Sequence, residues 1–330
     1  MMTMRRCFVC AADMLAPSER HLIYPVGRRR LFPFACASCG VLLEGGADAS
    51  RCRAHLAEAL AAQVFVPDPD APYGLDLYTL RTAATGLGRG IRPLDAEGRV
   101  ALRHPHDGHA ARAALYALDG SDKCPVSLGL LCRPSEVDAV LASLPAQAGW
   151  TDDITILLDS DITPPGAVSV AGFPAGAVRV TARPLEGDFA AQRNALQALA
   201  RHAWMLQLDA DETLDPASGR LLPALVALAE AGAVRSIGLA RFNCVDGVLS
   251  DVYPDVQYRL NRNDVRYAGR VHERPQLADG WPESFISLHG GIEHRLSRAH
   301  VAARSRRYEA LDPGRGRPEE EDALLRPYRD

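Results

Sequence analysis

The sequence of 330 residues contains a single lysine, Lys123, so arginine supplies nearly all of its positive charge. The formal net charge is −4, and 24% of the residues are charged. A balance of this kind gives no overall attraction to nucleic acid or to an anionic membrane. We therefore expect no nucleic-acid partner, and we read each arginine by its place in a motif.

Long apolar runs are also missing. The longest, "LLPALVALAEAGAV" (221–234), contains Pro223 and Glu230 and is shorter than the roughly 20 residues of a membrane span. Near the N-terminus, "CFVCAADML" is interrupted by Asp13 and is too short for a signal sequence. We therefore expect no transmembrane segment and a cytoplasmic location, where the eight cysteines would be thiols or metal ligands.

Five of these cysteines lie in the first 52 residues, and four form two C-x2-C pairs: Cys7 with Cys10 and Cys36 with Cys39. Such pairs turn the chain so that both sulfurs face one tetrahedral ion. Between them, "HLIYPV" and "RLFPFA" suggest two short strands around Gly27, and a helix follows at 51–65. The spacing predicts a zinc-ribbon-like module over residues 1–60 with structural Zn²⁺; incidental thiol clusters are the alternative.

Residues 61–122 form a connector of uncertain structure. It includes "RHPHDGHAAR", in which His104, His106 and His109 accompany Asp107. A His-x-His pair near an aspartate could bind a metal ion. The sequence favours instead a polar loop before a helix at "AARAALYAL" (110–118).

After Lys123, strand-like and helix-like segments alternate. Apolar runs of strand length occur at 124–132, 152–161, 177–183 and 204–212, and segments with helical spacing occur at 135–149 and 187–203. This order predicts an α/β fold with a mostly parallel central sheet. Ligands of such sheets bind beyond the carboxyl ends of the strands. Asp159 and Asp161 follow one predicted strand, and Asp209 and Asp211 follow another.

The acids in "MLQLDADETL" (205–214) need an explanation, because neighbouring carboxylates repel each other unless a cation, a helix N-terminus or a ligand compensates them. A cap or turn is one interpretation, since "DETLDPASG" has turn chemistry, but a cap needs only one acid. A second is a haloacid-dehalogenase-like phosphotransferase, with Asp209 as phosphoryl acceptor and Asp211 as general acid. That architecture usually opens with the motif and uses a later lysine, and no lysine follows Asp211.

The third interpretation rests on a resemblance. The pieces that carry it are "VSLGLLC", "ITILLDSD", "GDFAAQRNALQALARHAWMLQLDADETL", "YRLNRNDVRYAGRVHERP" and "RSRRYEAL". Over about 123–311 the chain resembles family 2 glycosyltransferases of the GT-A fold, which place Gln-Arg-Asn on a helix one strand before a D-x-D motif. A charged tail (312–330) follows. Because "DSDITPPG" departs from the family pattern, a non-catalytic zinc-ribbon adaptor with a degenerate nucleotide-binding domain stays an alternative.

The resemblance implies an inverting, hexosyltransferase-type enzyme that moves a sugar from a nucleoside-diphosphate sugar to an acceptor hydroxyl, with Mg²⁺ or Mn²⁺ on the diphosphate. It implies Asp211 as direct metal ligand and Asp209 toward the ribose or the metal and its water shell. It also implies Asp159 at the base or ribose, Arg193 at the diphosphate, and His294 at the metal or diphosphate.

An inverting transfer also needs a general base to take the proton of the acceptor hydroxyl. "GRVHERP" offers Glu273, which we expect in this role. The alternative for Glu273 is a structural carboxylate paired with Arg270 or Arg274. For His294 the alternative is a histidine at the edge of the core.

Overall fold

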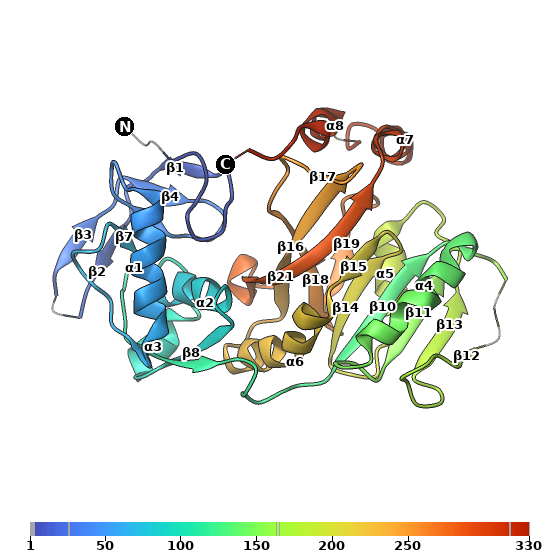
Figure 1. Ribbon diagram of the computed structural model, residues 1–330, viewed down its shortest axis with the longest axis horizontal. Helices are drawn as coiled ribbons and strands as arrows, with labels where there is room; N and C mark the ends of the chain where they lie inside the picture. Colours follow the sequence, from blue (N-terminus) through green and yellow to red (C-terminus); the bar gives the residue numbers. More distant parts are fainter. Residues whose placement is uncertain (1–3, 26, 163, 165, 317, 330) are drawn as a thin grey trace.

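The computed structural model describes residues 4–25, 27–162, 164, 166–316 and 318–329. Val26 of the first predicted strand and Asp330 of the predicted tail lie outside these residues. Figure 1 shows a smaller N-terminal part beside a large twisted sheet with helices on its faces. No helix among these residues is both long and apolar enough to cross a membrane.

The cysteine-rich segment folds into short strands and one helix. A four-stranded antiparallel sheet has the order β1-β4-β5-β7, and a separate hairpin joins β2 and β3. The elements are β1 (Leu15–Pro17), β2 (His21–Ile23), β3 (Arg29–Leu31), β4 (Phe34–Cys36), β5 (Leu42–Leu43), β7 (Tyr73–Gly74) and α1 (Ala49–Ala61). Strands β2, β3 and β4 occupy the region around Gly27 where two strands were predicted, and α1 covers most of the predicted helix.

Residues 61–122 are folded and pack against the cysteine-rich segment. They contain β6 (Val64–Phe65), α2 (Leu77–Thr85), β8 (Arg89–Pro93), α3 (Ala96–Ala101) and β9 (Ala113–Ala117), with sheet order β6-β9-β8. Their buried side chains share one core with the four predicted metal cysteines. The packing is therefore continuous across residue 60, and the division into two separate regions at that residue stays a prediction.

The helix predicted at 110–118 is wrong, because Ala113–Ala117 is strand β9. Ala113 and Leu115 are buried, whereas Ala114 and Tyr116 are only half-buried. This two-residue period suits a strand between β6 and β8. Pairing with both neighbours overrides the helix propensity of the alanines.

The large sheet has ten strands in the order β12-β13-β11-β10-β14-β18-β16-β21-β15, with β17 paired to β16. Its strands are β10 (Val126–Cys132), β11 (Ile154–Leu158), β12 (Ala167–Val168), β13 (Val178–Ala182), β14 (Trp204–Asp209), β15 (Glu212–Leu214), β16 (Ser236–Val245), β17 (Val248–Leu249), β18 (Asp255–Arg262) and β21 (Ser284–Leu296).

The sheet is mixed, so the prediction of a mostly parallel sheet holds only for its first half. Strands β13, β11, β10 and β14 are parallel as expected. Beyond β14, β18 is antiparallel to both neighbours, whereas β16 and β21 are parallel. The loop between β16 and β18 is too short for the crossover that parallel strands need, so these two strands form a hairpin.

Helices cover both faces of the parallel half. Leu128 and Leu130 of β10 share a core with α4 and α6, whereas Leu131 shares another with Leu196 of α5. The remaining elements are η1 (Pro134–Glu136), α4 (Val137–Ser143), η2 (Leu144–Gln147), α5 (Phe189–Gln197), α6 (Pro216–Ala231), β19 (Arg266–Ala268), β20 (Arg274–Gln276), η3 (Trp281–Glu283), α7 (Arg298–Leu311) and α8 (Pro318–Leu325).

The predicted charged tail is ordered over its described residues. It contains α8, and the segment after α8 runs beside β17, where Tyr328 N–H donates to the Leu249 carbonyl at 2.8 Å. Leu324 is buried with Val245, Leu296 and Val301. An apolar anchor of this kind explains why a highly charged segment does not extend into solvent.

Gly129 allows α5 to approach β10 closely. A Cβ atom at this position would lie 2.8 Å from Leu196 Cδ2 and from Met205 Sδ. We predict that Gly129→Val lowers the free energy of unfolding by about 1–3 kcal/mol, because the added methyl groups overfill the contact. Urea denaturation of Gly120→Val is the control, since a Cβ at Gly120 meets nothing within 4 Å. Equal midpoints for the two variants would contradict the close packing of α5.

Candidate metal and nucleotide site

The carboxyl ends of the parallel strands open into a cavity of about 570 Å³. Strand register places Leu131 beside Asp209 and Cys132 beside Leu158. Asp209, the last residue of β14, and Asp159, which directly follows β11, therefore lie at one edge of the sheet. Six residues singled out from the sequence line this cavity: Asp159, Arg193, Asp209, Asp211, Glu273 and His294. The sheet therefore brings together side chains that are up to 135 positions apart in the sequence.

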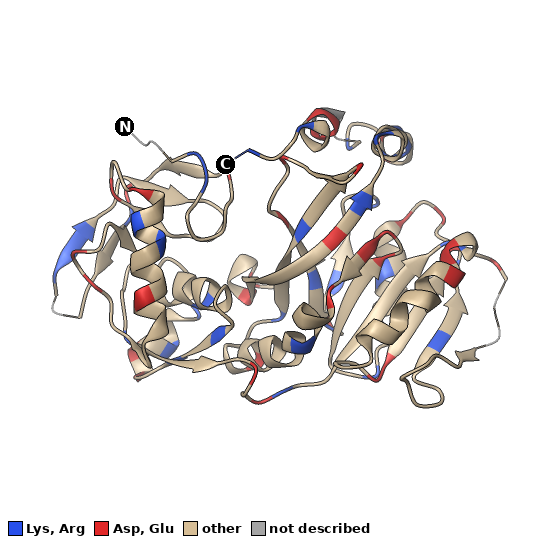
Figure 2. Ribbon diagram, in the orientation of Figure 1, with Lys and Arg blue, Asp and Glu red and all other residues tan. Residues whose placement is uncertain are grey.

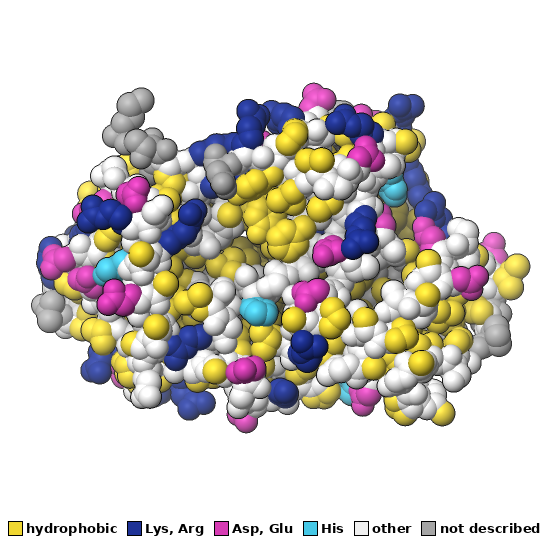
Figure 3. Space-filling view, viewed as in Figure 1, with side chains coloured by type: hydrophobic (Ala, Val, Ile, Leu, Met, Phe, Trp, Pro, Cys, Tyr) yellow, Lys and Arg dark blue, Asp and Glu magenta, His cyan; other side chains and the backbone are white. Residues whose placement is uncertain are grey.

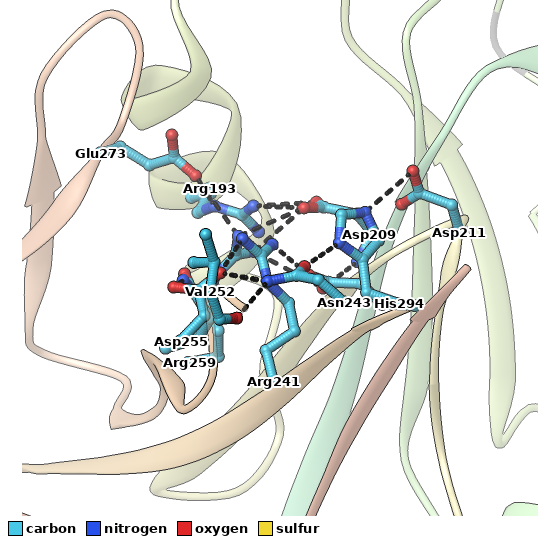
Figure 4. A network of polar contacts seen from close by, with 12 residues as sticks. Arg193, Asp209, Asp211, Arg241, Asn243, Val252, Asp255, Arg259, Glu273 and His294 are labelled. Atoms are coloured by element: carbon cyan, nitrogen blue, oxygen red, sulfur yellow. Dashed lines mark hydrogen bonds and ion pairs between the residues drawn. The ribbon is translucent and has the colours of Figure 1, made fainter. Parts of the chain in front are cut away.

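Asp209 lies between two buried arginines (Figure 4). Arg193 Nη2 donates to both of its carboxylate oxygens, at 2.8 and 2.9 Å, and Arg259 Nη2 donates to Oδ2 at 3.2 Å. Burial opposes ionisation of Asp209, but the two guanidinium groups outweigh this effect and hold its pKa well below the usual range. Asp209 is therefore ionised at neutral pH, with most of its hydrogen-bonding capacity in use.

Arg193 is held by three parts of the chain. It lies on α5, is 1% exposed, and its Nε donates to Glu273 while its Nη2 contacts Asp209. The next residue, Asn194, accepts from Tyr267 N–H at 2.8 Å and donates to the Tyr267 carbonyl at 2.9 Å. Helix α5 thereby connects β14 with the loop that carries Glu273. Only Nη1 of the Arg193 guanidinium lacks a partner among the described residues.

Glu273 is an ion-paired carboxylate in this structure. Its partners are Arg193 and, at 3.9 Å, Arg259. They differ from Arg270 and Arg274, the two partners considered from the sequence. Burial raises the pKa of Glu273, but the charges of Arg193 and Arg259 outweigh burial and leave the pKa below its usual value. The carboxylate is consequently ionised but weakly basic.

A second pair of acids flanks Arg241 on β16. Arg241 Nη1 donates to Glu212 at 2.8 Å, and its Nε donates to Asp255 at 3.0 Å. Burial disfavours the charged form of Asp255, but Arg241 and Asn243 lower its pKa to about 2. The other oxygen of Glu212 accepts the Asp209 backbone N–H at 3.1 Å, so this pair supports the turn that carries the D-x-D acids.

Counted as ionised, the network has an excess of two negative charges. Its charged members are the carboxylates and guanidinium groups of Asp209, Asp211, Glu212, Asp255, Glu273, Arg193, Arg241 and Arg259. Five carboxylates therefore meet three guanidinium groups. Asp209 and Asp211 are about one-third exposed at their side chains, and Arg304 and Arg307 line the same cavity, so this count is compatible with a divalent cation but does not require one.

Asp211 and His294 form the part of the network that could receive such a cation (Figure 4). His294 is 3% exposed, and its Nε2 lies 3.3 Å from Asp211 Oδ2. Burial raises the pKa of Asp211, but the hydrogen bond and charge of His294 outweigh burial and lower it. His300 on α7 lies 3.9 Å from the same oxygen.

Asn243 determines which nitrogen of His294 faces Asp211 as a possible ligand. Asn243 Nδ2 donates to the Asp255 carboxylate at 3.0 Å, which directs its Oδ1 toward His294 Nδ1 at 2.7 Å. An amide oxygen only accepts, so Nδ1 carries a proton. The hydrogen bond to Asp211 requires a proton on Nε2 as well, and loss of that proton would give Nε2 the lone pair that a metal ligand needs. A metal-bound histidine usually donates its other ring N–H to an acceptor, and the side-chain carbonyl of Asn243 is such an acceptor here.

Helix α7 adds positive charge to the opposite wall of the cavity. Basic residues recur along this helix (Figure 2), and Arg304 and Arg307 line the cavity. Their guanidinium groups lie 5.9 Å from the Tyr308 ring and 5.7 Å from the Phe189 ring, respectively. Among the side chains that the structure describes, no carboxylate lies within 4.0 Å of either arginine. These two cations therefore remain able to bind an anion.

Asp159 has a structural contact as well as a place on the cavity wall. Its Oδ1 accepts the Leu185 backbone N–H at 2.8 Å. This bond ties the end of β11 to the loop before α5.

Sequence reasoning missed Arg241, Asn243, Asp255, Arg259 and the α7 arginines. The signal for two of them was present, because Arg241 and Asn243 are polar residues two positions apart on a largely buried strand. The residues that they bind lie elsewhere in the chain, so the sequence pattern of one strand could not reveal the network.

The four predicted metal cysteines come together at a second site. Their sulfur atoms all lie within 4.8 Å of one another and are buried, with Cys7 and Cys39 3.6 Å apart and Cys10 and Cys36 3.7 Å apart. Each C-x2-C pair ends in a tight turn, closed by Ala11 N–H to the Cys7 carbonyl and by Gly40 N–H to the Cys36 carbonyl. Four sulfurs in such a cluster could bind Zn²⁺.

The histidines at 104–109 form no comparable cluster. Among the described residues, the four cysteines are the sole group of three or more His, Cys, Asp or Glu side chains close enough to share an ion. His106 instead contacts Arg20 and lies 3.4 Å from Asp76, the N-cap of α2. The loop therefore holds α2 beside the cysteine turns, since Arg20 also donates to the Gly40 carbonyl.

We predict that Arg193→Gln lowers the free energy of unfolding by about 3–5 kcal/mol, because two carboxylates lose a buried partner. Asp209 and Glu273 have pKa values lower in the folded protein than in the unfolded chain. The ion pairs therefore stabilise the fold above about pH 4–5, and this contribution disappears as the pH falls through the lower, folded-state values. Urea denaturation at pH 7 and pH 3 measures the difference.

The matched control is Arg201→Gln. Arg201 is half exposed, and its Nε lies 3.6 Å from Asp153, so its loss should change stability by less than about 1 kcal/mol. A loss for Arg193→Gln that is small, or equal at both pH values, would contradict the buried network.

For the second site, we predict one Zn²⁺ per chain, measured by atomic emission on protein purified without added metal. Cys36→Ser should lower the content to near zero and destabilise the N-terminal part, because a structural zinc supplies folding free energy. Cys124→Ser is the control, since Cys124 lies outside the cluster. Full zinc content in Cys36→Ser would rule out the four-cysteine site.

No protein-family model matches the chain, and no curated protein matches it. Among solved structures, the chain is similar to S. aureus TarS at 10% identity and a TM-score of 0.33, over 60% of this chain and 42% of that one. TarS 1-349 matches at 9% identity and a TM-score of 0.30, and its complex with UDP at 8% and 0.31, each over 60% of this chain and 69% of that chain. The chain thus spans less than half of the first structure, and scores this low leave the function to be argued from the site itself.

Proposed function

We propose that the chain is a metal-dependent glycosyltransferase that moves a sugar from a nucleoside-diphosphate sugar to an acceptor hydroxyl, with inversion, in a GT-A-type domain over 123–311. The observation that carries the proposal is the Asp211–His294 pair at the carboxyl edge of the sheet. It faces a cavity that also holds the cations of Arg304 and Arg307. A metal-ligand pair beside cations that can bind an anion suits a diphosphate.

The donor atoms of the site favour Mn²⁺ over Mg²⁺. Asp211 supplies carboxylate oxygen and His294 supplies imidazole nitrogen, and a nitrogen ligand suits Mn²⁺ better than the all-oxygen preference of Mg²⁺. Asp209, one-third exposed at its side chain, would meet the ribose or the water shell of the ion. When bound, the ion would neutralise the charge that develops on the leaving diphosphate.

The chain's own residues would hold the rest of the donor. Arg304 and Arg307 are the groups we assign to the diphosphate, because an arginine fork matches phosphate oxygens. Arg193, which the resemblance also assigns to the diphosphate, has only its buried Nη1 without a partner, so a contact with the diphosphate would require it to release Asp209 or Glu273. Asp159 is assigned to the base or ribose.

Glu273 is the carboxylate we propose as general base. Its ion pairs keep it deprotonated at neutral pH, which a base requires, but they also lower its basicity. Acceptor binding would therefore have to weaken its contact with Arg193. A base and a purely structural carboxylate differ in what their removal changes, and this difference can be measured.

The geometry of Asp209 does not favour a phosphotransferase. A nucleophilic aspartate needs a free oxygen, whereas both oxygens of Asp209 accept from arginine. The non-catalytic adaptor is distinguished from the transferase by the binding and turnover measurements below.

We predict that one nucleoside diphosphate among UDP, GDP, CDP and dTDP binds in the presence of Mn²⁺, more tightly than with Mg²⁺, in isothermal titration calorimetry. Asp211→Asn and His294→Ala should each weaken metal-dependent binding by roughly 10–100-fold, the usual effect of losing a ligand or its orientation. Asp152→Asn is the matched control, because Asp152 pairs with His202 at 2.7 Å outside the cavity.

Glu273→Gln tests the base in the same preparations. Loss of sugar-nucleotide hydrolysis with unchanged diphosphate affinity supports a base, whereas a fall in stability with hydrolysis retained indicates a purely structural carboxylate. Binding of no diphosphate by the native chain would remove the transferase proposal, and turnover of a phosphate monoester would support a phosphotransferase. Metal-dependent diphosphate binding without turnover of any sugar nucleotide would favour the adaptor.

A further inference from the structure

Arg6 precedes the first zinc-site cysteine and has no part in the chemistry proposed above. Its side chain is 4% exposed. Its Nη1 donates to the Ala11 carbonyl at 3.1 Å, within the turn that links Cys7 to Cys10. The conformation of that turn, which the four-cysteine cluster closes, therefore sets the position of the guanidinium group.

The same guanidinium binds the loop between β17 and β18. Its Nη1 donates to the Tyr253 carbonyl at 2.5 Å, and its Nη2 donates to Asp251 Oδ1 at 2.7 Å and to the Asp251 carbonyl at 3.2 Å. The enclosed residue Val252 lines the cavity, and β18 begins two residues beyond Tyr253 with Asp255. Asp255 orients Asn243, which orients His294. The loop held by Arg6 therefore leads directly into β18, whose first residue begins the series of hydrogen bonds that positions the proposed metal ligand.

Arg6 also binds the C-terminal strap, which we define as residues 326–329. Its Nε donates to the Arg329 carbonyl at 2.6 Å, and its guanidinium lies 4.3 Å from the centre of the Tyr328 ring. The strap runs beside the same loop, because Asp251 N–H donates to the Arg326 carbonyl at 2.8 Å.

The strap continues directly from α8, and α8 packs on α7. Leu324 of α8 lies on the cavity wall and shares a small core with Val301 of α7. Helix α7 in turn presents Arg304 and Arg307 to the cavity. Both walls that the proposed nucleotide site needs, the Asp255 side and the α7 side, therefore connect to one buried arginine.

Contact between the N-terminal part and the sheet is not continuous over the whole molecule. On the face seen in Figure 3, a hollow with hydrophobic side chains lies between the two parts. Helix α2 reaches β21 elsewhere, where Tyr78 Oη donates to the Ser284 carbonyl at 2.6 Å. The neighbouring Arg5 also contacts Asp251, but it is 37% exposed and screened by solvent.

We propose that Arg6 is a positioning residue that couples the four-cysteine zinc site to the cavity, by holding the 251–253 loop and the C-terminal strap in register with the Cys7–Cys10 turn. Loss of zinc or of the Arg6 guanidinium would release the loop and the strap together. Helices α7 and α8 would then lose their fixed position, and the cavity would bind its ligand more weakly. The effect on ligand binding rests on the proposed function, whereas the effect on the strap does not.

The test is hydrogen–deuterium exchange of the full chain without nucleotide. Arg6→Gln, and separately removal of zinc by a chelator, should speed exchange in 249–255, 298–311 and 318–329 by roughly tenfold or more, because a buried charged hydrogen-bond network is lost. Exchange in β10, β11 and β14 should stay unchanged. Arg53→Gln is the matched control, an exposed arginine of the same N-terminal part.

Two further variants keep the test decisive if Arg6→Gln folds poorly. Arg6→Lys retains charge but not the planar fork and should give an intermediate effect. A chain that ends at Leu325 should reproduce the faster exchange of α7 and α8, and Arg6→Gln in that chain should add little for these helices, because both changes remove the same contact. Additive effects, or unchanged exchange in α7 and α8, would overturn the coupling.

Affinity for the diphosphate identified by calorimetry provides the second readout. It should fall by roughly fivefold or more in Arg6→Gln, and it should stay unchanged in Arg53→Gln. If the native chain binds no diphosphate, the proposed function fails, but the exchange result still decides whether Arg6 holds the strap.

Discussion

The ion pair between the buried Arg193 and the partly exposed Asp209 is the constraint on which the rest of the site depends. It joins helix α5 to the carboxyl end of β14, and the Arg193 guanidinium in particular is shielded from solvent. An isolated buried charge is unstable, so each of these groups needs further partners. Glu273 and Arg259 supply them, and they draw the β19–β20 region and β18 toward the same point. The D-x-D turn is thereby fixed before any ligand arrives.

The same network includes Asp211 and His294, the pair that we propose as ligands of a cation. Its named members are five carboxylates and three guanidinium groups. Asn243 and Asp255 hold the imidazole so that Nε2 faces the aspartate. A site oriented in advance loses little conformational entropy when it binds. The α7 residues Arg304 and Arg307 line the same cavity from a different part of the chain, and they are the groups that we propose for the diphosphate.

The two proposed metal centres differ in chemistry and in access. Four buried sulfurs form a closed set suited to structural zinc, whereas a carboxylate and an imidazole at a cavity wall leave positions for a ligand. Arg6 connects them through hydrogen bonds, because it contacts the first cysteine turn, the 251–253 loop and the strap. Through these contacts the cysteine-rich segment is connected to residues that line the cavity.

Features that depend on local spacing could be predicted from the residues alone. Two C-x2-C pairs, four apolar strands and acids directly after two of them were enough to expect a cysteine site and a ligand edge, because carboxyl ends of parallel strands meet. The partners of these side chains came from the fold: Glu273 pairs with Arg193 and Arg259, and Asn243 orients His294. The fold also decided that 113–117 is a strand and that the second half of the sheet is mixed. The physical reason is that pairing and charge compensation join residues far apart in the chain, and their energies depend on distances that local patterns do not contain.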